Sequence, residues 1–539
     1  MPRSNPFPER VNPLAPLGEL AHWLVGTTID VALGLAIGMI AARLMRVRHL
    51  HWSWAACALA LVALLPAPLA HLAPVLAVAA LSASLRSRRW HREDSEAGAD
   101  LAELAARRRR PADLLRTSAN AIELHRRRTR GVEAWFLGEQ LILGRDERGG
   151  LVSIPFGGSG GGTHTLLVGA TGSGKTVTQT WMTIRAIERG MGAIVIDPKG
   201  DRDMRACVAR AARAADRTFI EWGPEGPWVY NPFAAGSETE IADKLLAGER
   251  YTEPHYLRQA QRFLGHVVRA LRNADREVSL RAVVEHLDPI SLELLVRAIP
   301  EDEGHATHAY LDSLTLRQQA DLAGVRDRLA ILAESDVGRW LDPLCADRGR
   351  FDLLEAVQAR AVVYFDLDAD SRPLLTQMLG AAIVQDLQTT VAALQGRPMP
   401  TVVVIDEFSA LAAEHVVRLF GRARSAGVSL VLSSQELTDL RLPGRETLLE
   451  QVMGNLTVLL AHRQVVPESA QLIASLAGNR GAWRTSRHGD GRLTRTRTSE
   501  QVLDRSDVMR LGPGWAAAIA LSAGGSARIA HVFAPEDEH

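Results

Sequence analysis

The chain has few cysteines and no net charge. Its three cysteines, Cys57, Cys207 and Cys345, lie far apart among 539 residues and form no CxxC pair. That spacing argues against a disulfide framework or a zinc site and fits a reducing compartment. The 62 basic and 62 acidic residues cancel, so no global field attracts nucleic acid, and any such attraction has to be local.

Lysine is so rare that each one is informative. Only Lys175, Lys199 and Lys244 occur, and arginine supplies the rest of the 62 basic residues. A compact ammonium and a planar guanidinium fork are not interchangeable at a phosphate. Lys175 stands in a phosphate-binding motif, which needs the ammonium. Lys199 stands in DPKGD (197–201), where the alternatives are a functional role and a simple polar turn after a strand.

Two long apolar stretches come first. Residues 21–42 contain a single acid and are long enough to span a bilayer. Residues 50–85 carry no formal charge but three prolines interrupt them, so they form one kinked span or a hairpin of two short segments. Arginines follow both stretches, and the positive-inside rule favours a first span directed inward and a hairpin or re-entrant pair that returns inward. Residues 1–90 are therefore predicted to be a multi-pass anchor in the cytoplasmic (inner) membrane, without the features of a cleaved signal peptide.

A basic connector follows the anchor. Residues 86–130 hold 13 arginines against seven acidic residues. Such a segment is typical of a chain held against anionic lipid, and contact with DNA is the alternative. The sequence VEAWFLGEQLIL (132–143) then predicts one or two short strands, so residues 91–150 are assigned to the connector and these strands.

The sequence HTLLVGATGSGKT (164–176) carries the clearest chemical motif. A buried strand over 165–168 leads into a GxxxxGK[ST] loop and a helix that ends near Gly190. Glycines let backbone N–H groups turn toward phosphates, and the helix N-terminus adds a positive dipole end. The predicted nucleotide-binding residues are Gly169, Ala170, Thr171, Gly172, Ser173, Gly174, Lys175 and Thr176, with Lys175 on the β- and γ-phosphates and Thr176 on Mg²⁺.

A second apolar strand, in TVVVIDEFSAL (401–411), ends in two acids. The carboxyl ends of parallel strands are where α/β sheets place their ligands. Asp406 is predicted to hold Mg²⁺ through water, and Glu407 to orient and polarise the attacking water. ATP and Mg²⁺ are accordingly the expected cofactors.

Two further segments fit a nucleotide site but leave alternatives open. VSLVLSSQ (428–435) predicts a strand that ends in Gln435, which either senses the γ-phosphate or water, or simply ends the strand. FGRARSAG (420–427) places Arg422 and Arg424 at a helix end. They either offer an arginine finger to a neighbouring subunit or lie in solvent, as arginines at helix C-termini often do.

These motifs, in this order behind N-terminal spans, resemble the TraG/TraD-type coupling ATPases of conjugative type IV secretion, within the FtsK–HerA group of P-loop motors. The resemblance covers roughly residues 150–235 and 355–530 and the anchor. It implies a RecA-like motor domain (151–235 and 351–535) interrupted by an all-α insertion (236–350), and a hexameric ring with ATP between subunits. It also implies Arg424 as the finger acting on the next subunit and Gln435 as the sensor. Relaxase or relaxosome and secretion-channel proteins are the implied partners, with DNA threaded through the ring. The proline-rich second apolar block departs from the two-helix anchor of the family.

A basic hairpin is predicted near the C-terminus. Residues 480–497 hold six arginines, with Trp483 and a turn at HGDG (488–491). The hairpin either contacts phosphates, with Trp483 stacking on a base, or is a solvated surface. No sequence-reading motif accompanies it, so DNA contact is expected to be non-specific.

The sequence thus predicts an α/β fold and a membrane-anchored ATPase that delivers DNA, with bound relaxase, to a type IV secretion channel. The alternatives are an FtsK-like DNA translocase, a protein-exporting motor, and a docking platform with slow ATPase activity. A DNA-reading winged helix would favour the FtsK-like use, and a rate indifferent to DNA would favour the last two.

Overall fold

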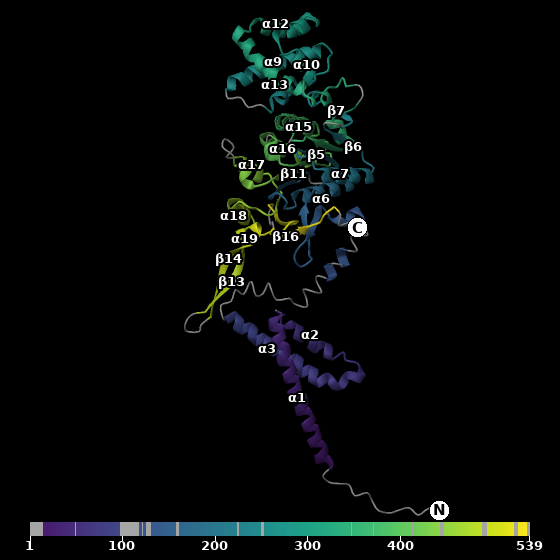
Figure 1. Cartoon of the computed structure of the whole chain (residues 1–539), viewed down its shortest axis with the longest axis vertical. Coiled ribbons are helices and arrows are strands. Elements are labelled where there is room, and N and C mark those ends of the chain that lie inside the picture. Colours follow the sequence, from purple (N-terminus) through teal and green to yellow (C-terminus); the bar gives the residue numbers. More distant parts are fainter. Residues whose placement is uncertain are drawn as a thin grey trace, which may run out of the picture. The chain divides into compact units, whose positions relative to one another are not determined.

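The computed structural model describes two compact units (Figure 1), Met1–Glu123 with Gly481–Ser499, and Leu124–Arg480 with Glu500–His539. In the basic connector (86–130), the arginine runs at 107–110 and 126–128 lie outside the described residues. The residues that the structure describes are 15–48, 50–96, 118–120, 122–124, 131–157, 161–223, 226–248, 253–345, 348–369, 371–411, 413–441, 447–487, 493–521 and 527–535.

The N-terminal helices pack with α1 and α3 running in the same direction. A Cβ on Gly34 would lie 2.8 Å from the Val75 carbonyl oxygen, so only glycine permits this close approach. Further along both helices, the Arg46 guanidinium lies over the Trp90 ring. The intervening chain must therefore travel back along α1 before α3 begins. The elements are α1 (Ala15–Val47), α2 (Ser53–Val62), η1 (Ala67–Leu72) and α3 (Ala73–Glu96).

Two of the described helical stretches are long and apolar enough to cross a bilayer, His22–Val47 and Ala67–Trp90. α2 has 10 residues and is about 15 Å long, half of a hydrocarbon core of about 30 Å. Because α1 and α3 are parallel, the arginines at 43–48 and at 86–89 lie toward the same end of the pair. This is the charge arrangement from which the sequence predicts a returning hairpin.

The predicted basic hairpin is present as a separate two-stranded sheet of β13 (Asn479–Arg487) and β14 (Leu493–Gln501). Arg480 lies 3.5 Å from Glu500, and the side chain of Arg497 is exposed. The turn at 488–492 lies outside the described residues, as do the side chains of 482–495, including Trp483.

A 12-stranded sheet organises the larger unit. Its parallel part has the order β12-β4-β11-β10-β5-β9-β6, and β15, β16 and β2 continue it in antiparallel fashion beyond β12. The expected short strands at 132–143 become η2 (Val132–Trp135), β1 and β2 at this antiparallel edge. The strands are β1 (Phe136–Leu137), β2 (Gln140–Arg145), β3 (Leu151–Pro155), β4 (His164–Val168), β5 (Gly192–Asp197), β6 (Phe219–Trp222), β9 (Val362–Asp366), β10 (Thr401–Ile405), β11 (Val428–Ser434), β12 (Val458–Ala461), β15 (Trp515–Ala520) and β16 (Ala527–Val532).

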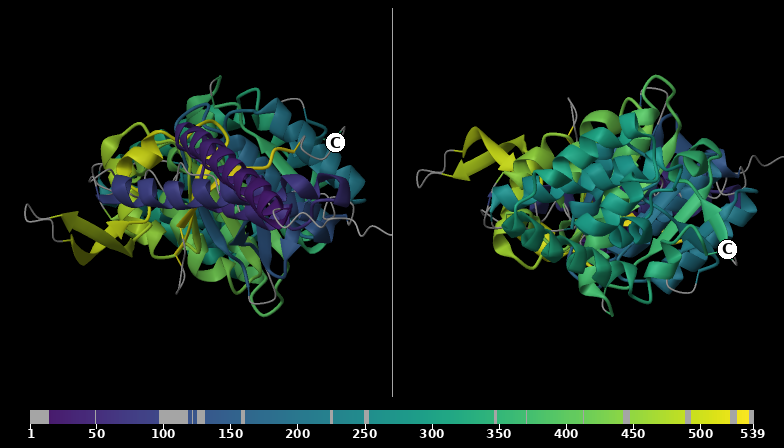
Figure 2. Two further views of the ribbon diagram at one scale, coloured as in Figure 1. Left: turned by 90° about the horizontal axis from the view of Figure 1, so that it is seen from below. Right: turned by 90° about the horizontal axis from the view of Figure 1, so that it is seen from above.

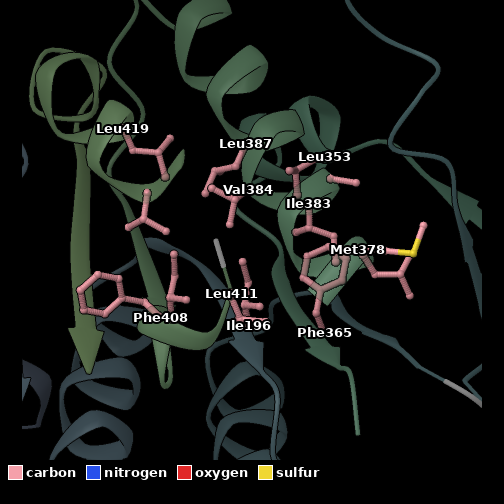
Figure 3. Packing of buried hydrophobic residues seen from close by; sticks show 14 of the residues in the cluster. Ile196, Leu353, Phe365, Met378, Ile383, Val384, Leu387, Phe408, Leu411 and Leu419 are labelled. Atoms are coloured by element: carbon pink, nitrogen blue, oxygen red, sulfur yellow. The ribbon is translucent and has the colours of Figure 1, made fainter. Parts of the chain in front are cut away.

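Helices cover both faces of the parallel strands, as continuous apolar strands require. Successive residues of a strand point to opposite faces. On β5, Ile194 and Ile196 join one core cluster, whereas Ala193 and Val195 join the other. Figure 3 shows Ile196 and Phe365 beside Met378, Ile383, Val384 and Leu387 of α15. The first face is covered by α14 (Leu353–Gln358), α15 (Pro373–Ala393) and α16 (Ala413–Ala423), and the second by α6 (Lys175–Glu188) and α7 (Arg202–Ala214).

A helical segment separates the two parts of the motor sequence. It lies between β7 (Trp228–Tyr230) and β8 (Gly349–Phe351), which pair with each other in parallel. Figure 1 shows α9, α10, α12 and α13 gathered beyond one end of the sheet, and Figure 2 shows them from above. The helices are α8 (Glu238–Leu246), α9 (Pro254–Asn273), α10 (Leu280–Glu285), α11 (Pro289–Val296), α12 (Glu301–Asp312), α13 (Leu316–Ala333) and η3 (Gly338–Trp340).

The C-terminal part of the sequence supplies the remaining short elements. These are η4 (Phe408–Ala410), η5 (Leu437–Leu440), α17 (Leu448–Met453), α18 (Pro467–Leu476) and α19 (Arg505–Met509). The predicted α/β class is confirmed, and the strands that carry the motifs are adjacent and parallel.

Candidate nucleotide site

The GxxxxGKT loop joins β4 to α6 at the carboxyl edge of the parallel strands. Gly172 and Gly174 have φ values of 72° and 106°, a region that glycine adopts readily. A Cβ on Gly174 would lie 3.1 Å from the amide nitrogen of Gly514. That amide donates to the Ser173 carbonyl at 3.0 Å, so the backbone before β15 supports the loop from behind.

The loop offers hydrogen-bond donors that an anion can accept. α6 begins at Lys175, so the N–H groups of its first turn have no acceptor within the helix. The Ser173 side chain is 1% exposed, and its hydroxyl has no hydrogen-bond partner within the part of the chain that the structure describes. Donors arranged in this way at a helix N-terminus fit a chain of phosphates.

Lys175 reaches across the end of β11. Its Nζ donates to the Ser434 carbonyl at 3.0 Å and lies 3.8 Å from Oε1 of Glu407. Burial lowers the pKa of this ammonium, and the charge of Glu407 partly opposes that shift. The buried ammonium has one close partner, the Ser434 carbonyl, and a carboxylate farther away. A further anion close to it would therefore be favourable.

Asp406 and Glu407 follow β10 directly. Asp406 is 6% exposed, and its carboxylate accepts a hydrogen bond from the Ser433 hydroxyl on β11. Glu407 has φ 45° and ψ 44°, a left-handed conformation that costs a non-glycine residue roughly 1–2 kcal/mol. Its N–H donates to the Ser433 hydroxyl at 3.1 Å, which holds the strained turn in place.

The Glu407 carboxylate is surrounded by donors. Gln435 Nε2 lies 3.0 Å from Oε1 and 3.2 Å from Oε2, and Lys199 Nζ lies 2.5 Å from Oε1. Lys199 Nζ is also 3.4 Å from Asp406 Oδ2. The structure therefore brings together Lys175, Asp406, Glu407 and Gln435, from three neighbouring strand ends.

Lys199 lies in a hydrogen-bonded turn that follows β5. The Asp197 carboxylate, buried at the end of β5, accepts from the N–H groups of Lys199, Gly200 and Asp201 at 2.9, 3.1 and 2.6 Å. The Tyr364 hydroxyl donates to the same carboxylate at 2.6 Å. Burial raises the pKa of Asp197, although these hydrogen bonds oppose the shift. The DPKGD segment is thus an organised part of the site and not a loose turn.

The donor set fits Mg²⁺. Thr176 is the second residue of α6, which follows the loop after β4. Asp406 comes directly after β10, and β11 lies between β4 and β10. β4 and β10 are two strand spacings, about 10 Å, apart, so both ligands lie near the same stretch of the sheet edge. Hydroxyl and carboxylate oxygens are the ligands that Mg²⁺ prefers.

Arg424 lies at the opposite edge of the sheet from its own loop. Its guanidinium is 3.4 Å from the Gly162 carbonyl and 3.4 Å from the Thr457 hydroxyl, both near the start of β4. The five residues of β4 separate that point from the loop by about 17 Å. Arg424 and the exposed Arg422 therefore do not join the four residues gathered within one chain.

His462, which packs beneath the phosphate-binding loop, was not identified from the sequence. His462 follows β12, is fully buried, and pairs its Nε2 with the Thr178 hydroxyl at 3.0 Å. Burial lowers the pKa of His462 to about 4, so the ring is neutral at pH 7. A Cβ on Gly169 would lie 2.6 Å from the His462 Cβ, which is why the loop opens with glycine. The only available signal was a polar residue directly after an apolar strand.

This chain resembles known coupling proteins in part of its sequence. Residues 400–513, which include Asp406, Glu407, Arg424 and Gln435, match a family model described as the TraM recognition site of TraD and TraG. The type 4 coupling protein DotL of Legionella pneumophila is 31% identical over 100 residues, which span 16% of this chain and 13% of DotL. The resemblance to TraG/TraD-type coupling ATPases is confirmed. The matched part is a small share of DotL's own length.

Solved structures show the fold of this TraG/TraD-like chain. The bacterial conjugative coupling protein TrwBdeltaN70 superposes with a TM-score of 0.55 at 14% identity, over 72% of this chain and 88% of the TrwBdeltaN70 chain. VirB4 of Thermoanaerobacter pseudethanolicus gives 0.51 at 16% identity, over 75% and 99%. A TrwB complex with ADP and Mg²⁺ gives 0.52 at 16% identity, over 69% and 85%. The predicted RecA-like fold of the motor is confirmed.

Proposed function

We propose that this protein is a membrane-anchored coupling ATPase that binds ATP with Mg²⁺ and delivers DNA, with bound relaxase, to a type IV secretion channel. The observation that carries the proposal is the convergence of Lys175, Asp406, Glu407 and Gln435 at the end of the phosphate-binding loop. The TrwB complexes with ADP and Mg²⁺ and with a non-hydrolysable ATP analogue support the same assignment of cofactors.

The residues divide the work of hydrolysis. The loop amides and Lys175 bind the phosphates, and Glu407 takes a proton from the attacking water. Gln435, within 3.2 Å of both Glu407 oxygens, orients that carboxylate or the water. Thr176 and, through water, Asp406 would hold Mg²⁺, which neutralises charge on the phosphate oxygens. Catalysis then depends mainly on positioning and electrostatics, because phosphoryl transfer needs little covalent help from the protein.

Arg424 is proposed to act on the site of a neighbouring subunit. Its distance from its own loop supports this role, since a guanidinium about 17 Å from the phosphates cannot stabilise them. In a ring of identical subunits, a residue on the opposite edge of the sheet can face the next loop. A hexamer with ATP between subunits is the arrangement that the TraG/TraD resemblance implies.

DNA is the proposed cargo, with relaxosome proteins as partners. The match to a model described as a TraM recognition site supports a docking role for part of residues 400–513. The arginine-rich hairpin of β13 and β14 supplies local positive charge on a chain with no net charge. Such contacts are non-specific and weaken with salt.

The anchor is proposed to place the motor in the cytoplasm. Its helices differ in how they enter the membrane. α1 crosses the membrane, and α2 and α3 form a re-entrant hairpin that enters and leaves on the cytoplasmic side. The parallel packing of α1 and α3 and the 10-residue length of α2 support this arrangement. Both arginine clusters then lie on the cytoplasmic side, as the positive-inside rule requires.

The proposal is tested by ATP binding and hydrolysis of the full chain in nanodiscs. Wild-type protein should bind a fluorescent ATP analogue and release phosphate in the presence of Mg²⁺. Lys175→Ala should lose both activities, because the buried ammonium is the principal cationic contact to the phosphates. Turnover that survives this substitution would refute the assigned site.

A further inference from the structure

Two of the three lysines of the chain converge on one carboxylate. Lys175 Nζ is 3.8 Å and Lys199 Nζ is 2.5 Å from Oε1 of Glu407. The third, Lys244, is paired with Asp386 elsewhere. The phosphate-binding role of Lys175 explains its presence, but nothing in that role explains Lys199.

The position of Lys199 is fixed by the backbone. Its own N–H and the next two donate to the buried Asp197 carboxylate, which Tyr364 also holds. The side chain is 45% exposed, yet its ammonium meets Asp406 as well as Glu407. Burial alone would lower the pKa of Lys199, but the charges of Asp406 and Glu407 outweigh it and raise the pKa. The distances themselves place the ammonium between the two acids, within ion-pair reach of each.

Hydrogen-bond donors already occupy both oxygens of Glu407 in this arrangement. Oε1 accepts from Lys199 and Gln435, and Oε2 accepts from Gln435. An attacking water would have to compete with these donors for the carboxylate oxygens. The Lys199 ammonium beside Asp406 also takes the position near this carboxylate that a divalent cation would need, and it neutralises part of the negative charge that would attract the cation.

We propose that Lys199 is a positioning residue that holds Asp406 and Glu407 in the resting site and competes with Mg²⁺–nucleotide for them. The inference rests on the proposed function, since it assumes that Mg²⁺ and ATP are the ligands. In the occupied site the Lys199 ammonium would move away from Asp406 and Glu407, and Oε1 of Glu407 would then be open to the attacking water. We call the contact of Lys199 with Asp406 and Glu407 the latch. Because the latch opens only in the occupied site, Glu407 becomes available to water only when the nucleotide is bound.

The test compares Lys199→Met with wild type in the full chain in nanodiscs. The thermal unfolding midpoint is followed by intrinsic fluorescence while MgCl2 is titrated at a fixed concentration of a non-hydrolysable ATP analogue. Arg202→Met is the matched control, because it removes one positive charge from an exposed residue of the same segment. The Mg²⁺ concentration that gives half of the stabilisation should fall at least threefold in Lys199→Met and stay unchanged in Arg202→Met.

The outcomes separate the latch from the proposed function. If wild type shows no Mg²⁺-dependent stabilisation with the analogue, the proposed function itself fails. If wild type responds and Lys199→Met requires the same Mg²⁺ concentration, the latch is refuted and the site stands. A higher Mg²⁺ requirement in Lys199→Met would show that Lys199 helps to bind the nucleotide, and would also overturn the proposal.

Discussion

Lys244 is expected to contribute strongly to the packing of the helical segment, through α8, against α15, which covers the sheet. Its side chain is almost fully buried on α8 and its Nζ lies 2.6 Å from Asp386 Oδ1 on α15. It also donates to the carbonyls of Pro232 and Ala235 at 3.0 and 2.7 Å. The Tyr230 hydroxyl donates to Asp386 Oδ2 at 2.6 Å. All three ammonium donors and both carboxylate oxygens therefore have partners.

Lys244→Met should destabilise the larger unit by roughly 3–5 kcal/mol, because breaking a buried pair leaves an uncompensated group in an apolar surrounding. Asp386 would keep only the Tyr230 hydroxyl, and burial would push its pKa further upward, the direction it already has. The assay is urea unfolding of the full chain in nanodiscs, followed by tryptophan fluorescence.

The double variant Lys244→Met with Asp386→Leu is the control. Replacing both charges by apolar groups of similar volume is often nearly neutral, so much of the lost stability should return. A Lys244→Met protein within about 1 kcal/mol of wild type, with the same unfolding slope, would show that the buried Lys244–Asp386 pair is not a major source of stability. A double variant that is less stable than Lys244→Met alone would contradict the expected return of stability.

Glu407→Gln should bind the ATP analogue normally but hydrolyse ATP about 100-fold or more slowly, since the general base is removed; wild-type phosphate release would exclude Glu407 from that role. Arg424→Ala should lose turnover and regain part of it when mixed with Lys175→Ala, because each protein can complete a different site in a mixed ring. Mixed rings that assemble without recovering phosphate release would argue against action between subunits. His462 has a pKa of about 4 in the fold against 6.5 ordinarily. The unfolded chain therefore takes up the proton first, so the stability that His462 contributes is present above pH 6.5 and lost as the pH falls toward 4. Between pH 7 and 5, wild type should lose about 2 kcal/mol more than His462→Gln in urea unfolding; equal pH slopes would contradict the burial argument. A single cysteine placed in the η1 turn (67–72) of a cysteine-free variant should resist membrane-impermeant reagents added to either side of the membrane; ready labelling from outside would show that α2 and α3 cross fully.

The sequence predicted the parts of the site whose chemistry follows from a local pattern. The strand, glycine loop and helix around Lys175, and the apolar strand before Asp406, are local features that the sheet then brings together. The order of α/β elements also followed from alternating apolar strands and helices. In these regions local preference and tertiary packing agree.

Other features depend on contacts between distant residues and could not be predicted. Nothing in the sequence shows that Ser433 holds Asp406, or that Glu407 adopts a left-handed conformation above it. The placement of His462 beneath the loop depends on the pairing of β12 with β4. The meeting of Lys199 with Glu407 spans 208 positions of the sequence, so only its rarity as a lysine pointed to it.

The most direct test of the account is the ATPase rate of the full chain in nanodiscs, with and without DNA, across a salt series. A DNA-delivering ATPase should hydrolyse ATP at a Mg²⁺-dependent rate that DNA stimulates. This stimulation should fade as salt rises, because phosphate contacts release counterions. Comparing single-stranded with double-stranded DNA then distinguishes conjugative delivery from an FtsK-like use. A rate that no DNA changes at any salt concentration would contradict the DNA-delivery function and leave a motor for protein cargo or a docking platform.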